Sequence, residues 1–263
     1  MNLRLKGKKA LVTGSTKGIG FAIAMSLANE GASVVVNGRT DRAVNDAVKA
    51  IGEQSGAIVT GVAADGGTAA GVAKITQAVP NLDILVNNLG IYEVREFGDI
   101  TDADWLRLFE VNVLSGIRLS RHYMPLLMAK NWGRIVFISS ESGVNIPSEM
   151  IHYGFTKTAQ IAIARGLAEL TAGTAVTVNS VLVGPTRSEG VEEFVQSVAK
   201  QRSISEEQVE SEFFQTVRPS SLLKRFTTTD EIANMVAFLC SEASSATNGA
   251  AVRADGGCIK SIL

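Results

Sequence analysis

Residues 139–157, which read SSESGVNIPSEMIHYGFTK, carry hydroxyl and amine groups at spacings suited to proton transfer. Tyr153 and Lys157 are four residues apart, so on a helix their Cβ atoms share one face at about 5–6 Å. A phenol ionises at about pH 10, and we expect the ammonium of Lys157 to favour the phenolate and lower the pKa of Tyr153. Ser139 and Ser140 end an expected strand, RIVFISS, where a hydroxyl could hold a carbonyl oxygen against the tyrosine. The alternative is ordinary packing of a long side chain along its helix.

The composition is that of a globular protein with a sizeable core. The 263 residues are 46% hydrophobic and 19% charged, which excludes a disordered chain. The net charge of −1 argues against a nucleic-acid or anionic-membrane partner held by bulk electrostatics. The sequence has no apolar run of about 18 residues, and its opening MNLRLKGKKALVTG leads straight into an expected strand. We therefore expect no membrane span, no signal segment and a cytoplasmic location.

Cysteine and histidine are scarce. Cys240 and Cys258 do not make a disulfide framework, and two reduced thiols are favoured over a single bridge. The two histidines, His122 and His152, belong to no Cys/His cluster, so we expect no metal site.

Short apolar runs alternate with amphipathic stretches along the chain. The apolar runs predict strands at residues 9–13, 33–37, 57–62, 82–87, 134–139, 176–181 and 250–254. Helical spacing predicts helices at about residues 21–31, 41–52, 68–79, 101–119, 152–172 and 230–240. This alternation predicts an α/β fold, with about seven strands in one doubly wound parallel sheet and helices on both faces. No linker interrupts it, so we expect residues 1–263 to form a single domain.

Residues 186–224 break this rhythm with two polar helical patterns, VEEFVQSVAKQ and SEEQVESEFFQTV. Such an insertion is either a solvated excursion or a substrate lid. Its position between two core elements favours a helical substrate lid.

Residues 13–20, TGSTKGIG, follow the first expected strand and open the first expected helix. That context is the one a dinucleotide-binding loop requires. Gly14 and Gly18 would let the backbone approach a pyrophosphate, Gly20 would allow tight packing of helix on strand, and the helix N-terminus would present free N–H groups to the anion. The alternative is an ordinary glycine-rich turn from strand to helix.

Four motifs occur together in order: TGxxxGxG at the first turn, NNxG after the fourth strand, a Ser thirteen residues before YxxxK, and DGG near the C-terminus. The set resembles the short-chain dehydrogenase/reductase family, and the resemblance extends from residue 8 to residue 257. It implies a Rossmann fold and a nicotinamide cofactor used for reversible carbonyl reduction or alcohol oxidation.

The resemblance implies four catalytic residues. Ser140, thirteen residues before Tyr153, matches the family serine better than its neighbour Ser139 does. Tyr153 would be the proton donor, and Lys157 would lower its pKa and hold the nicotinamide ribose. Asn112 matches the family asparagine that orders a proton-relay water beside the lysine.

The resemblance also implies the cofactor contacts. The phosphate loop would contribute Gly14, Ser15, Thr16, Lys17, Gly18, Ile19 and Gly20; further contacts would come from Asp65, Asn88, Gly90, Tyr153, Lys157, Gly184 and Thr186. Leu89 stands where the family has a smaller residue and puts more bulk near the ribose. Val183 stands where the family has Pro, so we expect a more mobile or differently bonded loop. Thr186 and Ser188 are both candidates for the carboxamide or diphosphate.

The residue at the end of the second strand discriminates between NAD and NADP. An acidic residue there hydrogen-bonds the ribose 2′-hydroxyl of NAD, whereas an Arg binds the 2′-phosphate of NADP. Gly38 occupies the acidic position, Arg39 follows it, and Lys17 adds a second cation. We therefore expect a preference for NADP(H), with Arg39 in the phosphate site. The alternative is that Arg39 is a solvated loop residue and the enzyme uses NAD(H) or both.

The substrate would enter beside Ser140 and Tyr153. The expected walls are Tyr92, Glu141, Ser142, Met150, His152, Phe194, Phe213 and Phe214. This mixture contains no pair of Arg residues to clamp a carboxylate and suits a neutral ketone or aldehyde. The helix around Phe155, and the one that carries Trp105, are too apolar for a monomer, and the family resemblance implies a homotetramer.

These features favour an NADP(H)-preferring oxidoreductase that interconverts a carbonyl (ketone, aldehyde or 3-oxoacyl) and an alcohol, with Tyr153 as acid/base. One alternative is an NAD-dependent alcohol or polyol dehydrogenase. Another is a non-catalytic dinucleotide-binding regulator, which has no physical need for all four of the residues Asn112, Ser140, Tyr153 and Lys157. An enoyl reductase is disfavoured by the short spacing from Tyr to Lys.

Overall fold

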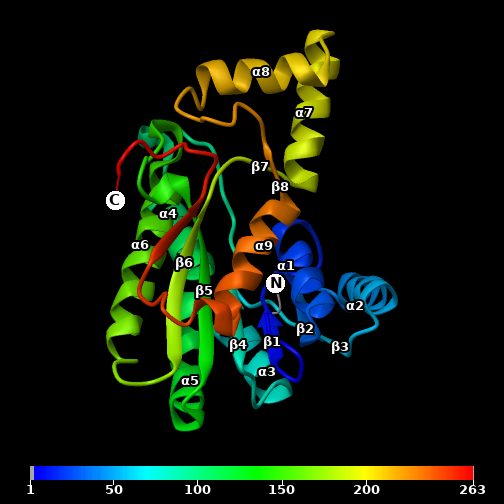
Figure 1. Cartoon of the computed structure of the whole chain (residues 1–263). Coiled ribbons are helices and arrows are strands. Elements are labelled where there is room, and N and C mark those ends of the chain that lie inside the picture. The colour runs from blue at the N-terminus through cyan, green and yellow to red at the C-terminus, as the bar shows by residue number, and fades with distance from the viewer. Residues whose placement is uncertain (1–2, 263) are drawn as a thin grey trace.

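The computed structural model describes residues 3–262, which form a parallel sheet of seven strands (Figure 1). The strands are β1 (Lys9–Val12), β2 (Ser33–Gly38), β3 (Val59–Ala63), β4 (Ile84–Asn87), β5 (Gly133–Ser140), β6 (Val176–Val183) and β9 (Ala251–Ala254). Their order across the sheet is β3-β2-β1-β4-β5-β6-β9. This confirms the doubly wound α/β fold, which is of the Rossmann type.

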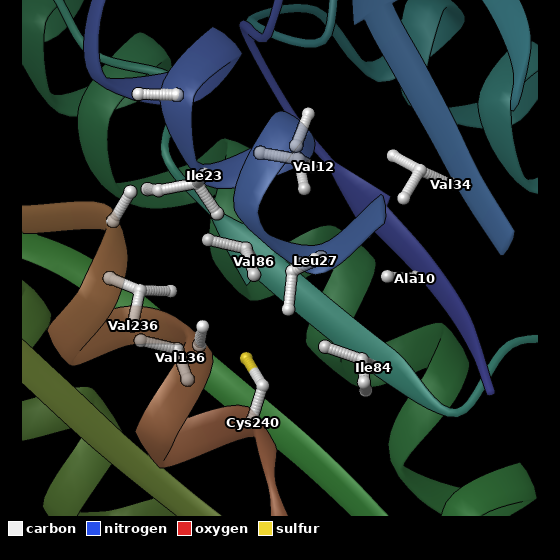
Figure 2. Close-up of a cluster of buried hydrophobic side chains, with 14 of the residues drawn as sticks. Ala10, Val12, Ile23, Leu27, Val34, Ile84, Val86, Val136, Val236 and Cys240 are labelled. Carbon is white, nitrogen blue, oxygen red and sulfur yellow. The ribbon is translucent and has the colours of Figure 1, made fainter. Parts of the chain in front are cut away.

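Helices cover both faces of the sheet because the strands are apolar on both sides. One face carries α1 (Gly18–Asn29), α2 (Asp41–Ser55) and α9 (Thr229–Cys240), which share a buried cluster that Figure 2 shows around Ile23, Leu27 and Val236. The other face carries α3 (Ala69–Ala78), α5 (Ser115–Lys130) and α6 (Ile151–Glu169), which share a second cluster. The sheet therefore lies between two separate apolar layers.

The chain changes direction across the sheet between β1 and β4. Strand β1 pairs with β2 on one side and with β4 on the other, so the connections after these strands leave a crevice at their carboxyl ends. Strands β5 and β6 are in register to their last residues, Ser140 opposite Val183, and Val183 lies opposite Ala254 of β9. The residues that follow these strands consequently meet at one edge of the sheet.

The helix expected over residues 101–119 contains an irregular turn. It begins as α4 (Asp102–Phe109), where Thr101 and Asp104 form a reciprocal capping box, and continues as α5. Between them, η2 (Glu110–Leu114) is a π-helical turn in which the N–H of Ser115 reaches the carbonyl of Glu110. Asn112 lies in this turn. Single π turns inside α-helices occur frequently at functional sites.

The polar insertion is a small layer of its own. It contains β7 (Thr186–Arg187), α7 (Glu189–Arg202), α8 (Glu206–Thr216) and β8 (Thr227–Thr228), and the two helices project beyond the edge of the sheet (Figure 1). They bury a separate apolar cluster that includes Val195 and Phe214. The guanidinium of Arg187 joins the two helices because it pairs with Glu192, Glu206 and Glu210. The two-residue strands were not expected, because strands this short leave no periodic pattern.

Three further observations concern membrane spans, metal sites and the cysteines. No helix in the described part of the chain is long and apolar enough to cross a membrane. Residues 3–262 contain no group of three or more His, Cys, Asp or Glu side chains that could hold a metal ion. Cys240 and Cys258 are both buried free thiols.

His152 lies in the packing between α4 and α6 instead of in the substrate wall where the sequence suggested it. It is fully buried, and its ring meets the edge of Trp105 with the centroids 6.0 Å apart. Within residues 3–262 neither ring nitrogen has a hydrogen-bond partner. Burial lowers the pKa of His152, because the imidazolium form would lose its hydration.

The buried imidazole predicts a pH-dependent stability. The unfolded chain takes up a proton below about pH 6.5 that folded His152 resists, so the free energy of unfolding should fall as the pH drops from about 7 to about 5. His152→Leu should flatten this slope and change the free energy of unfolding above about pH 7 by less than about 1.5 kcal/mol. Urea unfolding at each pH measures both effects. The exposed His122, replaced by Leu, is the control and should keep the wild-type slope; a wild-type slope in His152→Leu would contradict the assignment.

Candidate functional site

Two adjacent serines at the end of β5 have different roles in the structure. The hydroxyl of Ser140 accepts the N–H of Ser142 at 3.1 Å, and hydrogen bonding to this hydroxyl favours the phenolate form of Tyr153, which lies near the start of α6, and so lowers the pKa of Tyr153. The hydroxyl of Ser139 donates to the backbone carbonyl of Lys157 at 2.8 Å and is buried. The hydroxyl of Ser139 is thus occupied by the backbone, and Ser140 is the serine whose hydroxyl acts on the tyrosine.

Lys157 is buried beside this pair. Its Nζ donates to the backbone carbonyl of Ile138 at 2.8 Å and to Oε1 of Gln160 at 3.3 Å. The same Nζ lies 5.6 Å from the centroid of the Tyr153 ring. Burial lowers the pKa of Lys157 to about 8, because the ammonium has lost most of its water.

The pKa of Tyr153 moves in the opposite direction to the one the sequence suggested. Burial raises it to about 12, because the phenolate form would lose its hydration; the hydrogen bond from Ser140 opposes this effect and the nearby Glu141 carboxylate adds to it. The ammonium of Lys157 makes its hydrogen bonds to Ile138 and Gln160 instead of to the phenol oxygen, so its charge does not dominate.

Asn112 is almost fully buried and holds the chain that follows β4. Its Oδ1 accepts the N–H of Ile91 at 2.8 Å, while its Nδ2 donates to the Ile91 carbonyl at 2.9 Å and to Oγ1 of Thr156 at 2.9 Å. Thr156 in turn donates to the backbone carbonyl of Tyr153 at 2.7 Å. Asn112 therefore fixes the helix of the tyrosine and the loop opposite it in one arrangement.

The glycine loop has the conformation of an anion cradle. Gly14 and Gly18 both have φ of +60°, a backbone conformation that residues other than glycine rarely adopt. A Cβ on Gly20 would lie 2.4 Å from the carbonyl oxygen of Gly14, so only glycine lets α1 pack this closely. The loop therefore brings bare backbone to the N-terminus of α1.

A carboxylate already occupies the anion position of this cradle. Oε1 of Glu189, at the start of α7, accepts the N–H of Gly18 at 3.1 Å. A carboxylate held by the first N–H groups of a helix is a stand-in for a phosphate. The residues present consequently fit the diphosphate of a dinucleotide.

The other loop residues are placed as follows. Ile19 lines the central cavity described below, whereas Ser15 is fully buried and donates its hydroxyl to the Val12 carbonyl at 2.6 Å. Asn88 donates through Nδ2 to the carbonyls of Thr13 and Gly14 at 2.9 and 3.1 Å. Ser15 and Asn88 therefore hold the loop in shape with these side-chain atoms.

Leu89, which is bulkier than the family residue, lies against two glycines. Its Cδ1 would be 3.4 Å from a Cβ on Gly14, and its Cδ2 would be 3.4 Å from a Cβ on Gly66. Both distances are ordinary contacts, so the leucine packs against the two glycines without crowding them.

Two exposed cations follow the first two strands, Lys17 in the glycine loop after β1 and Arg39 directly after β2. Within residues 3–262 neither side chain has a hydrogen bond or an ion pair. A Cβ on Gly38 would stand 2.4 Å from Cγ2 of Thr16, so an acidic side chain at the position that serves NAD would require Thr16 to move. Asp65 is also exposed, and its Oδ1 accepts the N–H of Gly67 at 3.0 Å.

The loop after β6 is ordered by its neighbours. Val183 remains part of β6, and the N–H of Gly184 continues the pairing to the Ala254 carbonyl at 3.1 Å. A Cβ on Gly184 would lie 2.6 Å from the carbonyl oxygen of Asp255. The hydroxyl of Thr186 bonds Gly184 and Thr227, both at 2.9 Å.

These elements surround a cavity of about 1110 Å³, here called the central cavity. Ser140, Tyr153 and Lys157 line it together with Gly90, Gly184 and Thr186. Of the expected substrate walls, the following also line it: Tyr92, Glu141, Ser142, Met150, Phe194 and Phe213. Phe214 does not, because it is buried in the apolar cluster between α7 and α8.

An ion pair that the sequence did not reveal lies in the wall of the central cavity. Nε of Arg218, after α8, donates to Oε1 of Glu141 at 2.8 Å, and the hydroxyl of Ser142 bonds the same oxygen at 3.1 Å. The side chains of Glu141 and Arg218 are only 4% and 15% exposed. The cavity therefore has a polar wall whose charges are largely compensated.

Four other contributors were missed: Gln160, Thr156, Arg218 and Glu189. Gln160 had a signal, since it is a polar residue in the apolar run AQIAIA, one turn after Lys157. Arg218 and Glu189 had none, because their partners lie 77 and 171 residues away along the chain.

Comparison with known proteins gives a consistent picture. Residues 14–258 match the family described as Enoyl-(Acyl carrier protein) reductase. The chain is 48% identical over 264 residues to uncharacterized oxidoreductase YvaG of Bacillus subtilis (strain 168), with 100% of both chains covered. It is 35% identical over 259 residues to D-beta-hydroxybutyrate dehydrogenase of Cupriavidus necator, covering 96% of this chain and 98% of that relative.

A solved structure extends the match to three dimensions. L-Sorbose reductase from Gluconobacter frateurii, complexed with NADPH and L-sorbose, superimposes with a TM-score of 0.93 at 30% identity, covering 100% of both chains. The sheet order, the glycine loop and the cavity lined by Ser140, Tyr153 and Lys157 fit the same conclusion. The chain belongs to the short-chain dehydrogenase/reductase family and is an oxidoreductase.

Proposed function

We propose that the chain is an NADP(H)-preferring oxidoreductase that interconverts a carbonyl group, in a ketone, an aldehyde or a 3-oxoacyl group, and an alcohol. The observation that carries this proposal is that Ser140, Tyr153 and Lys157 line one cavity together. A nicotinamide dinucleotide, when bound, supplies or accepts the hydride at the substrate carbon. The glycine loop, Gly90, Lys157, Gly184 and Thr186 would hold it.

The protonation states suit carbonyl reduction near neutral pH. With a pKa of about 12, Tyr153 keeps its proton and can donate it to a substrate carbonyl oxygen. Ser140 steadies the same oxygen through its hydroxyl. The ammonium of Lys157, with a pKa of about 8, is mostly protonated at pH 7 and stabilises the phenolate that remains.

The environment of Arg39 supports the preference for NADP(H). The side chains of Arg39 and Lys17 are exposed and have no protein partner among residues 3–262, and Gly38 supplies no carboxylate where NAD would use one. A phosphate between two cations would make charge-assisted hydrogen bonds.

The polar wall supports a neutral substrate. Arg218 faces the central cavity, but its charge is paired with Glu141, so this wall offers hydrogen bonds without a free guanidinium to hold a carboxylate. Uncharged and hydroxylated ketones therefore head the list of candidates. A panel of ketones, aldehydes and 3-oxoacyl thioesters, screened by NADPH oxidation, identifies the substrate class.

We assign residues 186–224 as a substrate lid within a single domain. Phe194 of α7 and Phe213 of α8 reach the central cavity, and Arg218 anchors the segment on Glu141. The internal cluster of α7 and α8 lets the segment move as a unit.

A homotetramer in the cytoplasm completes the proposal. Leu106 on α4 and Phe155 on α6 are 68% and 45% exposed, and Leu170 at the end of α6 is 64% exposed, which supports a subunit partner over these helices. The free thiols of Cys240 and Cys258 support a reducing compartment.

Tyr153→Phe tests the mechanism. Removal of the phenolic proton donor should lower kcat by at least about 100-fold, while the dissociation constant of NADPH and the melting temperature stay near wild type. The matched control is Tyr92→Phe, because the Tyr92 ring contacts Tyr153 edge-on at 6.3 Å and lines the same cavity. Retained turnover in Tyr153→Phe would refute the acid/base assignment.

Arg39→Asp tests the phosphate site. It should raise the KM for NADPH by about 10- to 100-fold, since it removes a charge-assisted hydrogen bond, and should change the KM for NADH far less. Arg42→Asp, an exposed change on α2, is the control and should alter neither. Equal effects on both cofactors in Arg39→Asp would favour the NAD-dependent alternative.

Glu189→Gln tests the carboxylate in the glycine loop. Gln keeps an acceptor for the N–H of Gly18 but removes the negative charge that a diphosphate would meet there. The dissociation constant of NADPH should therefore fall by about two- to fivefold at low salt, and less at high salt. Fluorescence titration measures it, with the exposed Glu193→Gln on the same helix as control. Unchanged or weaker binding would show that the carboxylate does not compete with the cofactor.

A further inference from the structure

Gln160 lies on α6 three residues after Lys157, and it is 2% exposed. A buried primary amide needs partners for its donors and its acceptor. Its Oε1 accepts from Nζ of Lys157 at 3.3 Å, and its Nε2 donates to the backbone carbonyl of Asn112 at 2.6 Å. The amide therefore bridges the lysine and the π turn.

The chemistry of the partners fixes the orientation of this amide. An ammonium only donates and a carbonyl only accepts, so Oε1 must face Lys157 and Nε2 must face Asn112. A flipped amide would place donor against donor and acceptor against acceptor. The bridge thus has one direction, from the ammonium through the amide to the carbonyl.

We propose that Gln160 is a positioning residue for the proton-transfer site, whose amide fixes the direction of the Lys157 ammonium and ties it to the π turn that carries Asn112. This inference rests on the proposed role of Lys157 in catalysis. The ammonium has three donors, and the carbonyl of Ile138 and the amide of Gln160 take two of them. The third is left for the central cavity, which Lys157 lines.

The bridge also places a neutral amide where the family resemblance suggested a relay water beside Asn112. The Asn112 carbonyl accepts from Gln160, and the Asn112 side chain is bonded to Ile91 and Thr156. An amide holds a donor and an acceptor in fixed places but does not titrate near neutral pH. Its contribution is therefore orientation of the ammonium and stabilisation of its charged form.

The titratable and charged groups near the Lys157 ammonium would contribute to any titration of this lysine. Tyr153 on the same helix is the titratable neighbour, at 5.6 Å from Nζ to the ring centroid. On the neighbouring elements, Glu141 and Arg218 are paired with each other, and Glu110 in the π turn is paired with Arg118. Burial lowers the pKa of Lys157 because it disfavours the charged ammonium. The amide oxygen of Gln160 accepts a hydrogen bond from the ammonium and so favours the charged form, and its loss would lower the pKa of Lys157 further.

The test compares Gln160→Met with Gln160→Glu in the full-length protein. Met keeps the length and helix propensity of Gln but lacks the amide, so kcat should fall by about 10-fold with the KM of the ketone nearly unchanged. In the pH profile of kcat, the basic limb should move to lower pH, because Lys157 would lose its proton at lower pH. Glu restores an acceptor with negative charge, so it should recover part of kcat and move the limb to higher pH. Gln77→Met, on the exposed face of α3, is the control and should match wild type.

A second readout does not depend on turnover. The ε-carbon resonance of Lys157, assigned by its loss in Lys157→Met, should titrate at lower pH in Gln160→Met and at higher pH in Gln160→Glu. Wild-type kcat and titration in both variants would overturn the inference, as would losses in kcat that follow the melting temperature without a shift in either pH profile. If Gln160→Met is insoluble, Gln160→Leu takes its place. Shifted lysine titrations in a protein that reduces no carbonyl compound would instead refute the proposed function alone.

Discussion

An ammonium removed from water requires strong acceptors, and the burial of Lys157 sets this requirement at the centre of the site. The backbone carbonyl of Ile138 meets it from β5, and Gln160 meets it from the same helix. The ring of Tyr153 has its centroid 5.6 Å from this ammonium, and Tyr153 lines the same cavity as Ser140. The proposed proton transfer depends on this arrangement, because it keeps the phenol protonated and the charge that will stabilise its anion close by.

The parallel sheet brings these groups together from distant parts of the chain. Ser140 ends β5, the glycine loop follows β1, and Gly184 follows β6, so their common edge forms one wall of the central cavity. The opposite wall comes from the insertion, which Arg218 ties to Glu141. Geometry at the edge is therefore fixed by strand register, whereas the outer wall depends on one buried ion pair and the packing of α7 on α8.

The sheet and much of the site could be predicted because they depend on local sequence patterns. β-Branched runs and helical spacing predict the sheet, and the family match singles out Ser140, thirteen positions before Tyr153, over its neighbour Ser139. The π turn could not be predicted, since EVNVL fits a regular helix equally well. The predicted shift of the Tyr153 pKa was wrong in direction, because the burial of the phenol cannot be inferred from the spacing of Tyr153 and Lys157. Arg218 could not be found at all, since an ion pair across 77 residues leaves no local pattern.

The π turn at Glu110–Leu114 also limits how the gene can change. Such a turn holds one residue more than an α turn, so deleting a single codon there would regularise the helix instead of breaking it. Because the wider turn absorbs the extra residue, the deletion would leave α4 and α5 nearly in phase, and Trp105 would keep its contact with the ring of His152. Asn112 would instead lose the position from which its side chain bonds Ile91 and Thr156. The extra residue is consequently a requirement of the Asn112 contacts and not of the helix that contains it.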